Sequence, residues 1–389
     1  MTQISRLATL GLAKETVAGT YVAPTVGIPF QKGDFEDVFA EVKDESIRGN
    51  DTILQGVYQG TVHATWSLDF LAYPDLVGHF LAGVIGPDTV TPATTTTLST
   101  SSIVGATSIQ TAASLPTGTV IRIDTAANTE YAWTDGAATG TGPYTSNITT
   151  VLGKIGANRV GLQLAHTSSV AITTPTTHTF KQSTSPLPTY SLTLYDTTQT
   201  ISCSYVRWSD LQVKIDPKGA VQLSVKATSM PSVTQSNATP TYSTFDPLLG
   251  WSWTMTNAGA SSTRGLSFDA TVKRAVEAIA SSDGTQGPRE IFAGPIEVDG
   301  TYKVIFENQT DLGLYLNYTQ SPTTAMVQQP VARGGQSLAL TMSKSGYIKG
   351  KRDLGSAYAQ ADFSLVGIYN TTDGGAVQAV LQNFQTAAY

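Results

Sequence analysis

The chain has 389 residues, of which 13% are charged and 40% are hydrophobic, and its formal net charge is −6. The hydrophobic share excludes a chain that is disordered by composition, and the negative charge argues against a surface that grips nucleic acid. With Cys203 as its one cysteine, the sequence excludes a disulfide framework and a cysteine metal cluster. Low charge together with many short alternating segments predicts a mainly β protein with extensive buried contact surface.

The N-terminal segment has no basic stretch followed by an apolar core, so no secretory signal is visible. No run approaches the ~18 apolar residues of a membrane span. We therefore expect synthesis in a cytoplasm and no membrane partner. Residues 11–30 are punctuated by Gly and Pro, and we expect them to be extended and to end in a short strand at 26–30.

Residues 31–51 are rich in acidic side chains, with two phenylalanines interleaved. One interpretation is a solvated loop. The other is an arm that docks on a neighbouring subunit, since solvent-facing loops seldom carry two Phe residues. The candidate subunit-contact residues are Phe35, Glu36, Asp37, Phe39 and Glu41.

A strand and a helix follow this acidic segment. Residues 57–70 alternate between apolar and polar, which predicts a long strand. The spacing of apolar residues predicts a helix over 74–86, with Pro74 at its first position. Gly78 and Gly83 make this helix weak by itself, so we expect it to be held by packing on the sheet.

Residues 88–177 differ in texture from the rest, because they begin with a Thr-rich tract and continue with short strands and Gly-rich turns. We interpret them as a small β domain inserted into the larger one. Such insertions sit at surface loops, where they disturb few contacts. The first parent unit then comprises residues 1–87 and 178–250.

Residues 209–229 are the most regular part of the chain. Apolar residues alternate with polar ones on both sides of Asp216-Pro217-Lys218-Gly219, which suits a type I turn followed by a left-handed Gly. The predicted hairpin pairs Ile215 with Val221, Val213 with Leu223 and Leu211 with Val225, so that all apolar residues share one face. The wet face then carries Gln212, Lys214, Gln222, Ser224 and Lys226.

The last third, residues 251–389, repeats the order of segments in the first. A short strand, a loop-rich stretch over 263–295 and a second strand precede a segment at 310–316 that matches the predicted helix. In this comparison Gly300 takes the place of Gly60. Two interpretations stay open, a tandem duplication and ordinary β-sandwich regularity.

No enzyme constellation is present in the sequence. The four histidines lack metal-ligand spacing, and no nucleophile elbow, phosphate loop or dinucleotide motif occurs. The turn at 216–219 lacks the further carboxylates of a calcium loop. We therefore expect no catalytic, cofactor-binding or metal-binding residues and no cofactor.

The order of these segments resembles that of the major tail tube proteins of long-tailed, non-contractile bacteriophages (siphophages). The resemblance covers residues 1–87 and 178–389. It rests on the opening at 11–25, the strand and helix at 60–86, the segment Thr177-His178-Thr179-Phe180, the 209–229 hairpin and the segment at 283–288. The insertion departs from the basic pattern and is similar to small β modules of other phage structural proteins.

The resemblance implies an antiparallel β-sandwich with a flanking helix. Together with the repeated order of the last third and the inserted segment, the expected fold is two tandem tube-like units plus a small β insertion domain. It implies a virion structural protein whose rings stack into a tube through which DNA leaves the capsid without specific binding. The expected partners are further copies of the chain, a tape measure protein and a tail terminator. A duplicated chain would give a trimer with pseudo-sixfold symmetry, and an unduplicated one a hexamer.

The resemblance also implies which of the candidate surfaces would face the lumen and which would face outward. The wet face of the 209–229 hairpin becomes a candidate lumen face, although its two lysines fit a passage for sliding DNA poorly unless neighbouring acids pair with them. The insertion is expected to face outward.

A second class of function is a capsid-decorating or cell-surface carbohydrate-binding protein. Five tryptophans could stack on sugars, and Trp133 in the insertion is the best candidate, whereas Trp66 lies on an apolar strand face. An enzyme is a third and more distant possibility, and it would require a cleft with converging ionisable groups.

Overall fold

The computed structural model describes residues 4–150, 161–355 and 357–389, so part of the predicted insertion, residues 151–160, lies outside the described residues. The fold is mainly β with large antiparallel sheets, as the sequence predicts, and is consistent with a β-sandwich. Two α-helices occur in the described chain, α1 (Val77–Val84) and α2 (Thr310–Leu316), close to the predicted positions. Short 3₁₀ turns lie at η1 (Ser5–Leu7), η2 (Ala126–Asn128), η3 (Gly250–Ser252) and η4 (Val331–Arg333).

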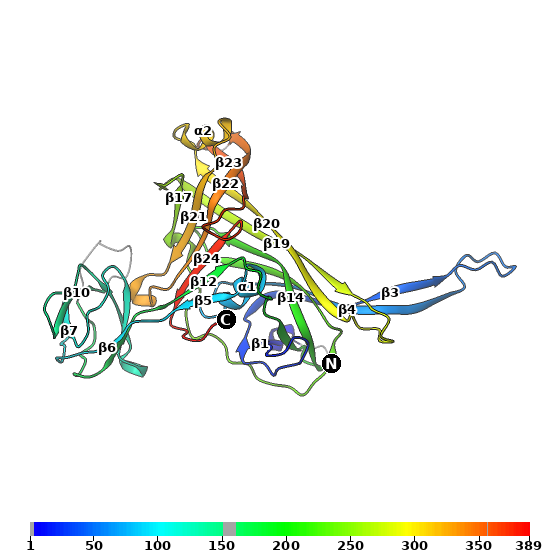
Figure 1. The fold of residues 1–389 in the computed structure, drawn as a ribbon, viewed down its shortest axis with the longest axis horizontal. Coiled ribbons are helices and arrows are strands. Elements are labelled where there is room, and N and C mark those ends of the chain that lie inside the picture. The colour runs from blue at the N-terminus through cyan, green and yellow to red at the C-terminus, as the bar shows by residue number, and fades with distance from the viewer. Residues whose placement is uncertain (1–3, 151–160, 356) are drawn as a thin grey trace.

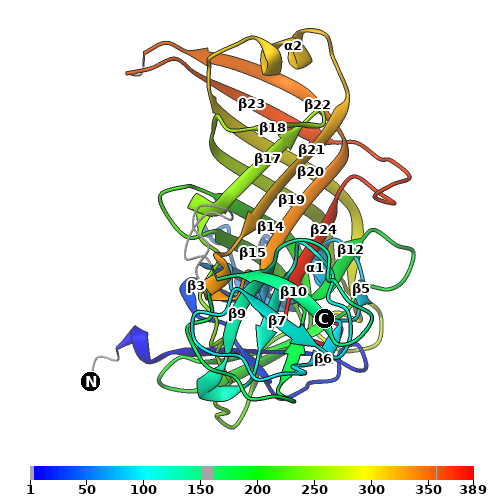
Figure 2. The same cartoon turned by 90° about the vertical axis from the view of Figure 1, so that its left-hand side faces the viewer.

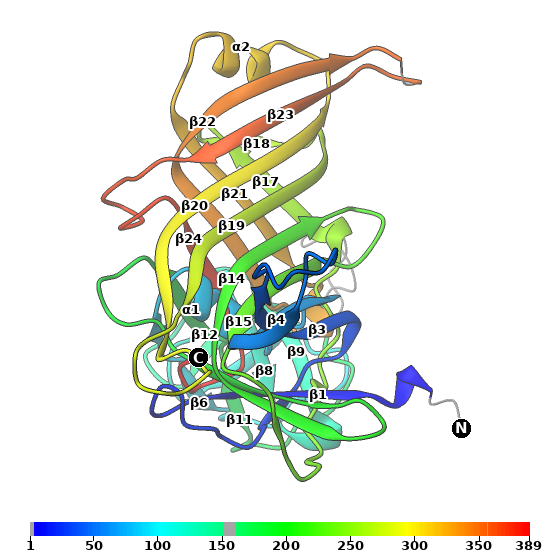
Figure 3. The same cartoon turned by 90° about the vertical axis from the view of Figure 1, so that its right-hand side faces the viewer.

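Eight strands form one continuous antiparallel sheet, called here the long sheet (Figure 3). Its order, read from the pairings, is β3–β4–β15–β14–β19–β20–β23–β22. The strands are β3 (Phe30–Asp44), β4 (Gly56–Leu71), β15 (Gln222–Ser229), β14 (Thr200–Ile215), β19 (Gly265–Ile279), β20 (Glu290–Ile305), β23 (Gln360–Gly367) and β22 (Ser337–Asp353).

The remaining strands of the body form the second layer, built from the other halves of β14 and β22. The first half of β14 pairs with β13 and β16, and β13 continues to β1 and β2. The first half of β22 pairs with β21 and β24, and these continue to β17, β18, β12 and β5. The strands are β1 (Thr9–Lys14), β2 (Val26–Gly27), β5 (Asp88–Thr91), β12 (Thr176–Lys181), β13 (Tyr190–Tyr195), β16 (Val233–Thr234), β17 (Trp253–Asn257), β18 (Ala260–Ser262), β21 (Ser321–Gln328) and β24 (Gln378–Asn383).

A separate six-stranded sheet lies within the predicted insertion, on the side of the body opposite the β3–β4 hairpin (Figure 1). Its strands are β6 (Thr95–Thr97), β7 (Ser108–Thr111), β8 (Val120–Ile123), β9 (Glu130–Thr134), β10 (Tyr144–Thr149) and β11 (Ala171–Thr173). It has its own apolar core, formed by residues such as Ile109, Ile121 and Ile172. The strands that enter and leave it, β5 and β12, pair with each other in the body.

One apolar core lies between the layers of the body. Alternation along the strands places one set of side chains inside, for example Leu211 and Val213 on β14. Helix α1 is buried on nearly all sides, since Phe80 packs on Phe70 and Trp208 with ring centroids 4.8 Å apart in both pairs. Packing of this kind holds a helix that its glycines would weaken in isolation.

The two halves of the long sheet share their irregularities. The β3–β4 pairing shifts register between Phe39 and Glu41, and the β19–β20 pairing shifts between Arg274 and Val276. At each shift an alanine carbonyl lies about 3 Å from the place where a Cβ of the facing glycine would be: 2.9 Å for Ala40 and Gly60, and 3.1 Å for Ala275 and Gly294. The two bulges therefore coincide in both strands.

The second hairpin of each half carries a matching bulge. The β14–β15 register shifts between Trp208 and Asp210, and the β22–β23 register shifts between Tyr347 and Lys349. Both residues before the shift are buried aromatics. The order hairpin, helix, hairpin thus occurs twice with the same bulges.

Several details differ from the sequence-based expectations. The segments at 31–51 and 263–295, expected as loops, contain most of the β3–β4 and β19–β20 hairpins, because their strands gain partners that the sequence alone does not reveal. When the two halves are aligned by their bulges, Gly294 takes the place of Gly60, whereas the sequence comparison gave that place to Gly300. The 209–229 hairpin has the predicted pairs Val213 with Leu223 and Leu211 with Val225, but Gly219 is not left-handed.

Candidate assembly surfaces

Two strands of the long sheet expose a free edge. Within the described residues, β3 pairs with β4 alone, and the distal half of β22, residues 346–353, pairs with β23 alone. Figures 2 and 3 show the β22–β23 hairpin at one end of the sheet and β3 at the other. Unpaired edges present backbone donors and acceptors that another strand can use, so these edges are candidate contact surfaces.

The predicted contact residues of the acidic segment all lie on β3. Phe35 is half-buried and its ring packs on Trp66, with centroids 4.5 Å apart. The Asp37 carboxylate accepts hydrogen bonds from the amide (3.0 Å) and hydroxyl (2.6 Å) of Ser232. The other three, Glu36, Phe39 and Glu41, are exposed. The segment is therefore an ordered strand at the sheet edge and not a solvated loop, and its docking on a neighbouring subunit stays a prediction.

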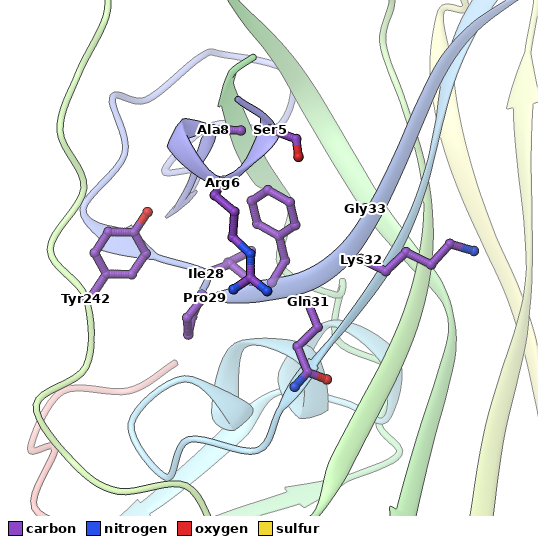
Figure 4. A pocket seen from close by; sticks show the side chains of 10 residues that line it. Ser5, Arg6, Ala8, Ile28, Pro29, Gln31, Lys32, Gly33 and Tyr242 are labelled. Carbon is purple, nitrogen blue, oxygen red and sulfur yellow. The ribbon is translucent and has the colours of Figure 1, made fainter. Parts of the chain in front are cut away.

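A pocket of about 520 Å³ lies where β3 begins (Figure 4). Arg6 from η1 and Gln31 reach towards its opening, Tyr242 forms the opposite wall, and Lys32 points away. A second pocket of about 280 Å³ lies along the core side of β3 and is lined by Leu10, Phe30, Gly33, Asp34, Phe35, Trp66, Leu68, Leu194 and Asp196. Gly33 and Phe30 line both pockets, so the start of β3 borders a partly apolar hollow.

The β3–β4 hairpin projects far beyond the body (Figure 1). We call residues 41–59, beyond the bulge between Phe39 and Glu41, the distal arm. Its large apolar side chains are exposed, with Ile47 at 99% and Ile53 at 78% of full accessibility, and so are Val42, Leu54, Val57 and Tyr58. An exposed apolar cluster of this kind marks a contact surface.

The opposite free edge is basic. Lys349, Lys351 and Arg352 are exposed on the distal half of β22, and neither lysine forms an ion pair within the described chain. The Arg352 guanidinium lies over the Phe306 ring, 5.4 Å from its centroid. Sequence reasoning missed this strand, although three of the four residues 349–352 are basic, just as three of the four residues 34–37 are acidic.

The predicted wet face of the β14–β15 hairpin lies opposite the core side. Gln212, Lys214, Gln222, Ser224 and Lys226 alternate with buried residues along the two strands. The Lys226 ammonium lies 3.7 Å from Asp210, and Lys214 faces Asp269 across the β14–β19 pair. The acids that the lysines need are thus supplied by the same chain.

The β14–β19 pair joins the two halves of the long sheet. It runs in register from Asp210 opposite Lys273 to Ile215 opposite Phe268. On the wet face, the Gln212 amide donates to both carboxylate oxygens of Asp269, at 2.7 and 2.9 Å, along the diagonal of the pair. On the core side, Ile215 and Phe268 are fully buried. This junction shows how the end of one half binds the start of the next.

Buried polar groups gather around the last residue of the chain. His178 lies between the Asp88 carboxylate, 2.7 Å away, and the Gln385 carbonyl. Burial alone would lower the pKa of His178, but these two partners outweigh it and raise the pKa. The ring of Tyr389 packs edge-on against His178 and His79. Burial, with a smaller effect of Lys14, lowers the pKa of His79 to about 4.

This polar cluster binds the chain to itself and does not form a metal centre. In the described residues no group of three or more His, Cys, Asp or Glu side chains could hold a metal ion. Burial raises the pKa of the Cys203 thiol to about 12, so it stays protonated in the core. No helix in the described part of the chain is long and apolar enough to cross a membrane.

The tryptophans do not assemble a sugar-stacking surface in the described residues. Trp66 and Trp208 are buried in the core, and Trp253 packs against it. Trp133 of the insertion is half-buried on β9, and Trp251 is exposed on η3. Neither of these two lines one of the two pockets described above.

Comparison with known proteins adds the identity of the family. No curated protein matches the sequence. The family described as phage tail tube protein matches residues 5–365, which is nearly the whole chain and includes both halves of the long sheet. Such proteins have a structural role in the virion tail, and the mainly β fold agrees with it. The chain therefore belongs to the phage tail tube protein family.

Proposed function

We propose that the chain is the tube subunit of a long-tailed, non-contractile phage. Its copies assemble into rings, the rings stack into a tube, and viral DNA passes through the lumen during ejection. The observation that carries this proposal is the long sheet, whose two halves repeat the same bulges and are joined edge to edge by β14 and β19. Continuing that sheet through further copies would close it and remove its free edges.

The repeat also supports a count of subunits. We propose that residues 1–87 with 178–250 form one tube-like unit and residues 251–389 a second. Three chains then supply six similar units, and the ring is a trimer with pseudo-sixfold symmetry. A ring of six full chains would contradict this count.

The lumen surface in this proposal is the wet face of the long sheet. Gln212, Lys214, Gln222, Ser224 and Lys226 belong to it. The lysines fit a passage for sliding DNA because Asp210 and Asp269 lie beside them and reduce the local positive charge. DNA should therefore pass without being held.

The insertion, residues 88–177, would face outward. Its sheet and the distal arm lie on opposite sides of the body (Figure 1), which supports separate roles for them. A tape measure protein within the lumen and a tail terminator at the tube end are the further partners that the family resemblance suggests. Synthesis takes place in the cytoplasm of the bacterial host.

Electron microscopy of the purified protein tests the proposal. We expect rings or tubes, with three copies per ring and six similar densities around the lumen. Monomers that bind glycans would instead support the capsid-decorating or carbohydrate-binding alternative. Monomers without glycan binding at high protein concentration would contradict both.

A further inference from the structure

The β14–β19 junction offers a template for the contact between copies. The strand that ends the first half, β14, pairs there with the strand that begins the second half, β19. The strand that ends the second half is β22, and the strand that begins the first is β3. Both have a free edge in the described chain.

The bulges convert this template into a residue-by-residue register. Aligning the β14–β15 bulge with the β22–β23 bulge matches Trp208 with Tyr347, and therefore Gln212 with Lys351. Aligning the two bulges that contain Ala40 and Ala275 matches Thr271 of β19 with Glu36 of β3.

We propose that β22 of one copy adds to β3 of the next copy in the register of the β14–β19 junction, with Lys351 directly opposite Glu36. This seam rests on the ring assembly proposed above and assigns its contact. It is heterologous, because each copy offers β3 to one neighbour and β22 to the other, and repetition gives a ring where the rotation between copies closes.

Charge complementarity supports this pairing. In the template, Gln212 contacts Asp269, which lies two residues along β19 from its direct partner Thr271. The same diagonal in the seam joins Lys351 to Asp34 and Lys349 to Glu36. Asp353, which would face Asp34, already accepts a hydrogen bond from the Gly355 amide at 2.9 Å, so its carboxylate is held by its own turn.

The same charges oppose the wrong pairings. Two β3 strands would bring Asp34 and Glu36 of one copy against those of another, and two β22 strands would do the same with their lysines. Like charges directly opposite each other are destabilising in a sheet. The edges therefore favour head-to-tail addition over a symmetric dimer.

The core side of the seam is complementary in shape. Ile215, buried opposite Phe268 in the template, corresponds to Leu354, which is 76% exposed. Phe268 corresponds to Gly33, and a void of about 280 Å³ lies beside this glycine. Leu354 of the neighbour would enter that void and occupy space that Phe268 fills in the second half. Arg352 would lie opposite Phe35, whose ring already packs on Trp66.

Cysteine cross-linking tests the register. The double variant E36C/K351C places the two thiols on directly opposed residues, whose Cβ atoms are about 4.5–5.5 Å apart in an antiparallel pair. Native Cys203 is buried and does not compete. We expect oxidation of assembled protein to give covalent dimers and trimers that reduction reverses, with no larger species. The control V38C/K351C is diagonal, at roughly 7–8 Å, and should cross-link at least about tenfold more slowly.

A charge exchange tests the seam without cross-linking. D34K/E36K makes the β3 edge basic, and K349E/K351E makes the β22 edge acidic. Each pair should raise the protein concentration needed for half-assembly at least about tenfold, and the four changes together should restore it to near the wild-type value. All four positions are exposed or part-exposed on one sheet face, and circular dichroism would confirm that the monomers fold.

The outcomes separate this seam from the tube itself. Rings that form without an E36C/K351C cross-link, or that cross-link better through V38C, would overturn the seam and leave the tube subunit intact. Normal assembly of both charge variants would also overturn it. A wild-type protein that never forms rings would overturn the proposed function and the seam together.

Discussion

The indole ring of Trp208 occupies the space that a side chain at Gly83 would need. A Cβ placed on Gly83 would lie far inside van der Waals distance of the indole, and close to Tyr190 as well. Trp208 is fully buried on β14, and Gly83 lies in the last turn of α1. The glycine that weakens the helix thus permits its close approach to the long sheet.

Replacing Gly83 with Ala should therefore destabilise the protein, by about 1–3 kcal/mol, as overpacking of a core usually does. Gly313 in α2 is a matched control, because a Cβ there meets no atom within 4 Å. G313A should be neutral or stabilise by up to about 1 kcal/mol through helix propensity. Urea unfolding followed by circular dichroism measures both variants, and a G83A protein as stable as G313A would contradict the packing argument.

The contrast between these glycines also shows which features of the fold can be predicted from the sequence. Alternation and turn residues predict the β14–β15 hairpin with its register, and apolar spacing predicts α1, because both signals are local. The glycine spacing suggests a weak helix but does not reveal that Trp208 lies against it. That contact joins residues 125 positions apart and depends on the whole core.

The strands that carry the candidate assembly surfaces are harder to predict from the sequence, for a related reason. Its charge and its two phenylalanines mark the acidic segment around Glu36 as unusual, but its strand conformation depends on pairing with β4. The basic charge around Lys351 does not by itself indicate a strand edge, since charged residues on an edge strand look like those of a solvated loop. A pairing between the two edges can be proposed only after the bulges are used to align the two halves of the long sheet.

Acid should destabilise the protein through His79. Its pKa of about 4 in the folded state lies below the value of 6.5 for a free histidine, because burial disfavours the charged ring. Between these pH values the unfolded chain binds more protons, so stability falls as the pH drops from about 6.5 to about 4, by up to about 3 kcal/mol. H79Q should flatten this part of the pH profile of the unfolding free energy.

His178 provides a control of opposite sign. Its raised pKa means that its contribution is present below pH 6.5 and is lost as the pH rises through its folded pKa. H178Q should therefore lower stability most at acidic pH and should not flatten the acid limb. If H79Q and H178Q change the pH profile in the same direction, the assignment to His79 is wrong.

The inserted β domain should be removable. Thr91 of β5 lies directly opposite Thr177 of β12, so a two-residue Asn-Gly turn can replace residues 92–176 and join the strands as a hairpin. The lost contacts with the body include the stacking of Tyr131 and the Arg122 guanidinium on Phe384. We expect folded protein that still forms tubes, as seen by electron microscopy. Loss of ring formation in a folded variant would place the domain in the ring contact.

Deleting part of the acidic segment should block polymerisation. The strand contacts determine which residues can be deleted without disturbing the sheet. Deleting residues 35–45, the simplest test from sequence, would remove Phe35 from its contact with Trp66 and disturb the sheet. The distal arm can be shortened cleanly, because Glu41 lies opposite Gln59, and an Asn-Gly turn can replace residues 42–58.

The shortened arm should leave the unfolding free energy within about 0.5 kcal/mol of wild type, since the removed apolar residues are exposed. It should abolish tubes in negative-stain images, because the exposed apolar residues around Ile47 and Ile53, which would contact a neighbouring subunit, are removed. The milder variant I47S/I53S should weaken polymerisation in the same direction. I103S/V104S, which removes two exposed apolar residues from the insertion, should not. Tubes of normal length from the shortened arm would show that the cluster has no part in assembly.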